Sequence, residues 1–216
     1  MRELIIDTAH IITILQKVAS DLKSHAEELR QLDAKLGDGD LGVTIELSSQ
    51  AMSEYLKSSN EKDIGKLLVQ CGMNINKVSP STFGTIIASA FMGGGRAMMG
   101  KTRISIEDLV LIGEAAVENI KKRGKAEVGD KTVIDTLIPA LETLKRENAR
   151  GADTQAALEA SIKAARDGME ATVNMKAKFG RAQWFHERSI GVQDGGATAM
   201  YYMMKSFTEN LILRKI

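Results

Sequence analysis

The sequence predicts an all-α protein, an antiparallel bundle of eight helices in a single domain that spans residues 1–216. Three observations indicate this class. Ala, Leu, Met, Lys and Glu are plentiful, whereas aromatic residues make up only 4% of the chain, a mixture that favours helices over sheets. Apolar residues recur at three- and four-residue steps, and no long segment alternates between apolar and polar residues. The connections between segments are mostly short, as in an antiparallel bundle.

The helices can be placed in order along the chain. We expect the first to span residues 3–35, because apolar residues from Ile5 to Leu29 share one face, and to end at Gly37. The fourth helix begins at the break Ser79-Pro80-Ser81 and reaches about Met99. Its three consecutive glycines, Gly93–Gly95, indicate either close helix packing or close approach of a ligand. The remaining helices are expected at residues 43–58, 60–78, 105–122, 132–148, 154–178 and 197–213.

Charge and cysteine content exclude several classes of protein. The net charge is +1, so no overall field attracts nucleic acid or a membrane surface, and we expect neither partner. The single cysteine, Cys71, excludes an internal disulfide and suits a reducing compartment, so we expect a cytoplasmic protein. Charged residues interrupt the apolar N-terminal segment, which we interpret as a core helix rather than a signal peptide.

A cluster of acidic residues follows the first predicted helix. Asp33, Asp38 and Asp40 lie within eight residues, separated by glycines that permit a tight bend. Carboxylates this close repel one another unless a cation lies between them, although Asp-Gly-Asp is also common in surface turns. A calcium EF-hand does not fit, because Val43 and Ser49 stand where that loop requires glycine and glutamate. We therefore expect Mg²⁺, with two ions roughly balancing the three aspartates in front of a phosphate ligand.

Three other segments carry weaker signals. The sequence VGDKT at residues 128–132 lacks the spacing of a P-loop and is more often only a helix cap. The connection Gly180–Gly196 is long and polar, and its Arg181 suits phosphate through paired hydrogen bonds, although a solvated loop is an equal alternative. The hydroxyls and amides of Ser79–Thr82, at a helix start, suit an anion or serve only as a cap.

Four motifs occur in an order that resembles the nucleotide-binding L subunit of dihydroxyacetone kinase: LDAKLGDGDLG, SPSTFGT, RGKAEVGDKTVIDTLIPALETL and GRAQWFHERSIGVQDGGATAMYYMM. The resemblance covers nearly the whole chain and implies an eight-helix antiparallel barrel with ADP or ATP at one end. It implies that two Mg²⁺ ions, held by Asp33, Asp38 and Asp40, bind the phosphates, and that Arg181 stabilises phosphate charge. The nucleotide contacts implied by the resemblance are Leu41, Gly42, Val43, Thr44, Ser79, Gly124, Val133, Arg181, Asp194, Gly195 and Gly196.

The chain departs from the family pattern at several of these contacts. Leu41 stands where the family usually has histidine, and Val133 where it has methionine. Residues 76–80 read NKVSP instead of a GGASG run, and residues 192–196 read VQDGG instead of His-Gln-Asp-Pro-Gly. The metal ligands implied by the resemblance are retained.

The function implied is that of a kinase subunit. It would transfer a phosphoryl group to an alcohol group of dihydroxyacetone or a related short ketose, held covalently on a separate K-type subunit, and would be active only with that partner. The alternative is a non-catalytic, nucleotide-sensing regulatory partner of such a kinase. The sequence leaves open the ketose, the stoichiometry with the partner, homodimer formation, and whether ATP or a phosphotransferase-system protein donates the phosphoryl group.

Overall fold

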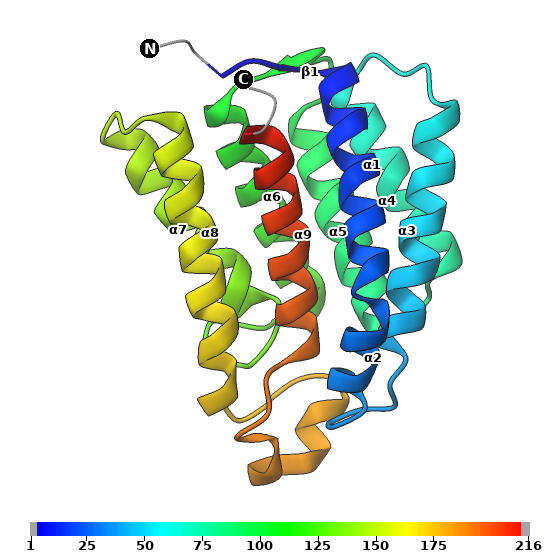
Figure 1. Ribbon diagram of the computed structural model, residues 1–216, viewed down its shortest axis with the longest axis vertical. Helices are drawn as coiled ribbons and strands as arrows, with labels where there is room; N and C mark the ends of the chain where they lie inside the picture. Colours follow the sequence, from blue (N-terminus) through cyan, green and yellow to red (C-terminus); the bar gives the residue numbers. More distant parts are fainter. Residues whose placement is uncertain (1–3, 213–216) are drawn as a thin grey trace.

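The computed structural model describes residues 4–212, and in this range nine α-helices run up and down beside one another (Figure 1). The helices are α1 (Thr8–Ser24), α2 (Ala26–Asp33), α3 (Leu41–Ser58), α4 (Ile64–Val78), α5 (Thr82–Ala97), α6 (Ile106–Gly124), α7 (Ile134–Ala149), α8 (Thr154–Ala171) and α9 (Gly195–Ile212). Two 3₁₀ segments, η1 (Thr172–Asn174) and η2 (Arg181–Ser189), lie between α8 and α9. Two short strands, β1 (Ile6–Asp7) and β2 (Arg103–Ile104), complete the elements.

The helices close into a barrel. Each helix from α3 to α9 packs against the next one along the chain, α1 packs against α3, and α9 returns to pack against α1. Because α2 continues α1 after a break at His25, the barrel consists of eight helical columns, hereafter the barrel wall. The predicted fold class, an all-α antiparallel eight-helix barrel, is therefore confirmed.

The first predicted helix differs most from the structure. It begins at Thr8 rather than residue 3, because Ile6 and Asp7 pair antiparallel with Ile104 and Arg103. Asp7 then caps α1 by accepting a hydrogen bond from the amide of His10 at 2.9 Å. Residue 3 itself, like residue 213 at the end of the last predicted helix, lies outside the described residues.

Two other helices have boundaries that differ from the predicted ones. The helix predicted at residues 60–78 begins only at Ile64, because the Asp63 side chain caps it and accepts from the amide of Lys66. The helix predicted to reach residue 178 ends at Ala171, and η1 follows it.

The glycines of α5 serve close helix packing. A Cβ atom added to Gly95 would lie 2.7 Å from the carbonyl oxygen of Gly65 in α4, and one added to Gly93 would lie 2.5 Å from the Asn119 side chain in α6. Neighbouring helices thus approach α5 on both sides at distances that exclude any larger residue. This accounts for glycines that would otherwise weaken a helix interior.

The two ends of the barrel differ (Figure 1). The β1–β2 pair and the last turn of α9 lie at one end, and the α2–α3 connection and η2 lie at the other. Between them, the interior holds an apolar cavity of about 230 Å³ lined by residues such as Leu15, Ile87 and Leu137. Within residues 4–212, no helix combines the length and the hydrophobicity needed to cross a membrane.

Candidate metal and nucleotide site

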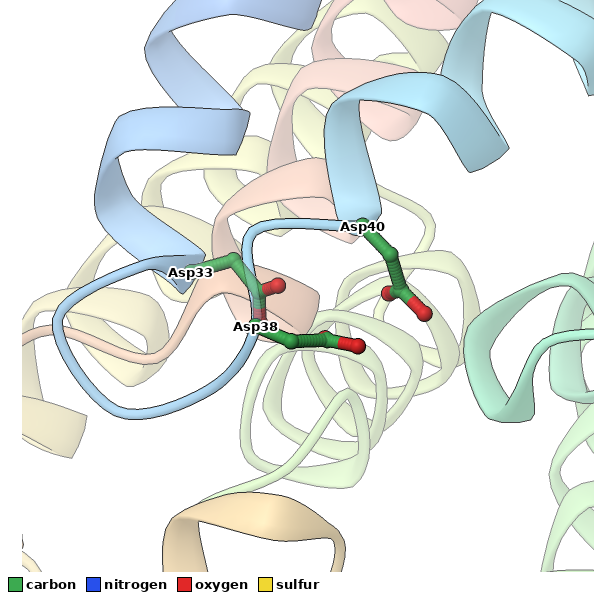
Figure 2. Close-up of side chains that lie close together, drawn as sticks. All are labelled: Asp33, Asp38 and Asp40. Atoms are coloured by element: carbon green, nitrogen blue, oxygen red, sulfur yellow. The ribbon is translucent and has the colours of Figure 1, made fainter.

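Three aspartates converge where α2 passes into α3, and we call them the acid corner: Asp33, Asp38 and Asp40 (Figure 2). Asp33 ends α2, Asp40 directly precedes α3, and Asp38 lies in the connection between them. One carboxylate oxygen from each lies within 4.8 Å of the other two. Gly39, with φ +73°, supplies the left-handed turn that brings the second and third aspartates round to the first.

The acid corner carries excess negative charge. Arg181, from η2, pairs through Nη1 with Asp38 and lies 3.3 Å from Oδ2 of Asp40. The structure therefore sets one guanidinium against three carboxylates. Burial, and then the negative charge of Asp33, raise the pKa of Asp40, as expected for carboxylates that repel one another. A divalent cation among these oxygens would relieve that repulsion.

The start of α9 lies against the acid corner. A Cβ atom on Gly195 would lie 2.9 Å from the end of the Leu41 side chain and 3.7 Å from Cβ of Asp33, so α9 begins in direct contact with Leu41 and close to Asp33. The preceding residue, Asp194, caps the helix: its Oδ1 accepts from the amide of Ala197 at 2.7 Å. Burial raises the pKa of Asp194 to about 6, although its hydrogen bond to Ala197 and the nearby Lys131 ammonium both act to lower it.

A buried hydroxyl without a partner in the described residues lies at the end of α4, shortly before α5 begins. Ser79 is 2% exposed, and its Oγ makes no hydrogen bond within residues 4–212. Gly84 packs tightly over it, since a Cβ there would lie 2.6 Å from that oxygen. Nearby, the Thr44 hydroxyl donates to Ser81 Oγ at 2.9 Å and so connects α3 to the N-cap of α5. Buried hydroxyls normally have partners, so Ser79 is unusual among the described residues.

The structure brings together most of the predicted site residues. The first turn of α3 holds Leu41–Thr44 directly after the acid corner, and Gly195 and Gly196 lie beside it. Val133 joins this group, because a Cβ on Gly196 would lie 3.4 Å from its side chain. Gly124 and Ser79 are not joined to this group in the same way: the atom nearest to a Cβ on Gly124 belongs to Ile86, and Ser79 packs against Gly84.

Sequence reasoning missed the part played by the GDKT loop. Lys131 is 1% exposed, and so is Asp135, which accepts hydrogen bonds from the amides of Gly129 and Thr132. Taken alone, this loop is more often only a helix cap, and the sequence gives no sign that Lys131 is buried. A lysine between a glycine turn and a helix carries no periodic signal, so burial there cannot be read from the sequence.

Known proteins resemble this chain in sequence and in fold. The family described as "DAK2 domain" matches residues 35–209. The "PEP-dependent dihydroxyacetone kinase, ADP-binding subunit DhaL" of Escherichia coli (strain K12) is 31% identical over 195 residues, which cover 90% of this chain and 93% of that protein.

Solved structures extend the comparison. The native crystal structure of the dihydroxyacetone kinase of C. freundii matches with a TM-score of 0.73 and 26% identity, covering 94% of this chain and 35% of that one. The present chain therefore spans about a third of that kinase. The structure of the same kinase in complex with AMP-PNP and Mg²⁺ also gives a TM-score of 0.73, at 24% identity and 97% coverage of this chain, and shows the same fold.

Proposed function

Since the chain belongs to the DAK2-domain family, and its resemblance to the L subunits of dihydroxyacetone kinase is confirmed, we propose that it is the nucleotide-binding subunit of a dihydroxyacetone or related short-ketose kinase. The observation that carries this proposal is the convergence of three carboxylates on one corner, beside the starts of α3 and α9. The E. coli relative is named for binding ADP, and the C. freundii kinase was crystallised with a nucleotide analogue and Mg²⁺.

The residues of the acid corner fit magnesium. Mg²⁺ prefers oxygen ligands and binds through a few carboxylates together with substrate phosphates, and the acid corner offers three carboxylates within 4.8 Å. Asp33, Asp38 and Asp40 would hold two ions, as the charge balance of the sequence suggests. When bound, the ions neutralise phosphate charge and polarise the transferred group.

The chain's own residues position and neutralise the phosphates. Arg181 already faces the acid corner and can turn its guanidinium to phosphate oxygens, which its planar donors match. The amides in the first turns of α3 and α9 point out of their helices and favour anions. The Ser79 hydroxyl supplies a further donor. Phosphoryl transfer by positioning and charge neutralisation requires no nucleophile from this chain.

The acceptor hydroxyl would come from a ketose held covalently on a separate K-type subunit, as the resemblance implies. Without that partner we expect no turnover. The donor is either exchangeable ATP or a phosphotransferase-system protein that rephosphorylates bound ADP. Both schemes use the same acid corner.

Replacing Asp38 or Asp40 by Ala tests the proposal. We expect phosphoryl transfer to dihydroxyacetone, assayed with a K-type subunit, to fall by roughly 10³-fold, because each change removes a ligand from the charge-neutralising site. Asp167→Ala is the matched control, since Asp167 is an exposed aspartate of α8 that pairs with Lys163 on the same helix. Wild-type turnover in either acid-corner variant would contradict the assignment.

The second candidate, a non-catalytic nucleotide sensor, is favoured by Leu41, which is buried against Gly195 where the family usually has histidine. Calorimetric titration with ADP and with ATP, each with Mg²⁺, separates the two functions. Tight binding without transfer to any short ketose would support the sensor.

A further inference from the structure

Lys131 is the most unusual residue that the proposed site leaves unexplained. It is 1% exposed, although lysine is almost never fully buried unless it is paired. Its backbone has φ +63°, a left-handed conformation that is unfavourable for a residue with a side chain. A buried charge and an unfavourable backbone at one position indicate that surrounding contacts fix this residue in place.

The Lys131 ammonium connects two distant segments. Its Nζ donates to the carbonyl oxygen of Thr172 at 2.6 Å and to the carbonyl oxygen of Val192. Thr172 directly follows α8, and Val192 lies shortly before α9. The same two segments are joined a second time, because the amide of Asp194 donates to the Thr172 hydroxyl at 3.1 Å. We call Lys131, Thr172, Val192 and Asp194 the lysine tether.

Neighbouring groups hold the lysine in this position. The carboxylate of Asp135 accepts from the amides on both sides of Lys131 in the chain, those of Gly129 and Thr132. Desolvation lowers the pKa of Lys131, while the negative charges of Asp194 and Asp135 oppose that change and favour the ammonium. Two nearby carboxylates therefore offset the positive charge of the ammonium, while its N–H groups donate to main-chain carbonyls.

The tether ends where the proposed nucleotide site begins. Asp194 is followed by Gly195, which lies against Leu41 and Asp33, and by Gly196, which lies against Val133. A small shift of the Val192–Asp194 segment would change how the start of α9 meets the acid corner. Within residues 4–212, the Lys131 ammonium bonds to Thr172 and Val192 and forms no ion pair with the three aspartates of the corner.

Resting on the proposed function, we propose that Lys131 is a positioning residue: its buried ammonium ties the end of α8 to the segment before α9 and so places Asp194, Gly195 and Gly196 for the nucleotide. It acts through main-chain carbonyls and does not touch the ligand. The GDKT sequence thus supports the nucleotide site from behind its lining residues and does not itself contact the nucleotide.

The variant Lys131→Met tests this role, since it keeps the length of the side chain but removes its charge and its donors. We expect the dissociation constant for ADP with Mg²⁺, measured by calorimetry, to rise about tenfold, because two buried carbonyls lose a charged donor. In nucleotide-free protein we expect faster amide hydrogen exchange at residues 192–200, with α4 unchanged. Lys178→Met is the matched control, because Lys178 pairs with Asp130 of the same loop but is 63% exposed.

If Lys131→Met does not fold, the variant Thr172→Val tests the same positioning role. It keeps Lys131 and its carbonyl partner but removes the hydroxyl that accepts from the Asp194 amide. We expect weaker ADP binding, about threefold or more, with the same local pattern of exchange.

The outcomes separate this proposal from the function on which it rests. If the wild type does not bind ADP with Mg²⁺, the proposed function fails and the positioning role falls with it. If the wild type binds and both variants bind equally well, only the positioning role is overturned. A uniform rise in exchange over the whole barrel with unchanged affinity would also overturn it, because Lys131 would then serve stability alone.

Discussion

The barrel wall and the acid corner are built on opposite principles. The wall buries aliphatic side chains between helices that are neighbours in sequence, and its glycines let those helices approach closely. The acid corner gathers like charges at one end and counters them with a single arginine, which lies 141 positions from Asp40. Burial in the wall therefore favours folding, whereas the repulsion among the carboxylates of the corner opposes it, and a bound cation would add to the relief that Arg181 gives.

The largest effect should come from opening the wall. Leu67, in α4, is 0% exposed, and we expect Leu67→Ala to lower the free energy of unfolding by about 2–5 kcal/mol, through lost burial and the cavity left behind. Leu111→Ala is the control, since Leu111 in α6 is 48% exposed and should cost far less. Urea unfolding measures both. Equal losses of unfolding free energy in the two variants would show that the buried face of the wall is no more tightly packed than its exposed face.

A smaller effect should appear at the end of the barrel that carries the acid corner, where Asp194 makes the free energy of unfolding depend on pH. The pKa of Asp194 is raised from 3.8 to about 6, so the folded protein binds more protons than the unfolded chain between these values. Stability contributed by this group is greatest below about pH 4 and is lost as the pH rises to about 6.

Asp194→Asn removes this titration. We expect the variant to gain stability relative to the wild type between pH 4 and pH 7, by about 3 kcal/mol at most, because each unit of the pKa rise corresponds to about 1.4 kcal/mol. Urea unfolding of both proteins over that range gives the difference. A difference that stays constant with pH would show that Asp194 is ionised without penalty in the fold.

The smallest effect concerns Ser79, and here stability and binding should move in opposite directions. Ser79→Ala removes a buried hydroxyl that lacks a partner, so we expect the free energy of unfolding to rise by about 1 kcal/mol. If the hydroxyl serves the nucleotide, affinity for ADP with Mg²⁺ should fall at the same time. Thermal unfolding and calorimetry measure the two quantities, and a loss of both would mean that Ser79 is structural.

The same contrast explains how much the sequence predicts. The helices of the wall follow from apolar periodicity, and the three aspartates lie so close in the chain that their convergence could be expected. The β1–β2 pair could not be expected, because it joins residues such as Ile6 and Ile104. The break at His25 was equally hidden, since the apolar pattern continues through it.

At the site end, the sequence supports predictions where partners are near in sequence or a motif is recognisable. Arg181 was expected to serve phosphate, but its pairing with Asp38 and Asp40 depends on how η2 folds over the corner. Lys131 was missed because its carbonyl partners, on Thr172 and Val192, lie 41 and 61 positions away. Main-chain acceptors carry no side-chain signature, so such a contact leaves no trace in the residue pattern.

The segment η2 also carries Trp184, the sole tryptophan of the chain, with 74% of the residue exposed. It lies three positions from Arg181 on the same short segment. Its fluorescence therefore reports on one place in the molecule without any label. An indole so open to water emits at long wavelength, so a ligand or a second protein that covers this segment would shift the emission to the blue and make its arrival visible in a stopped-flow trace.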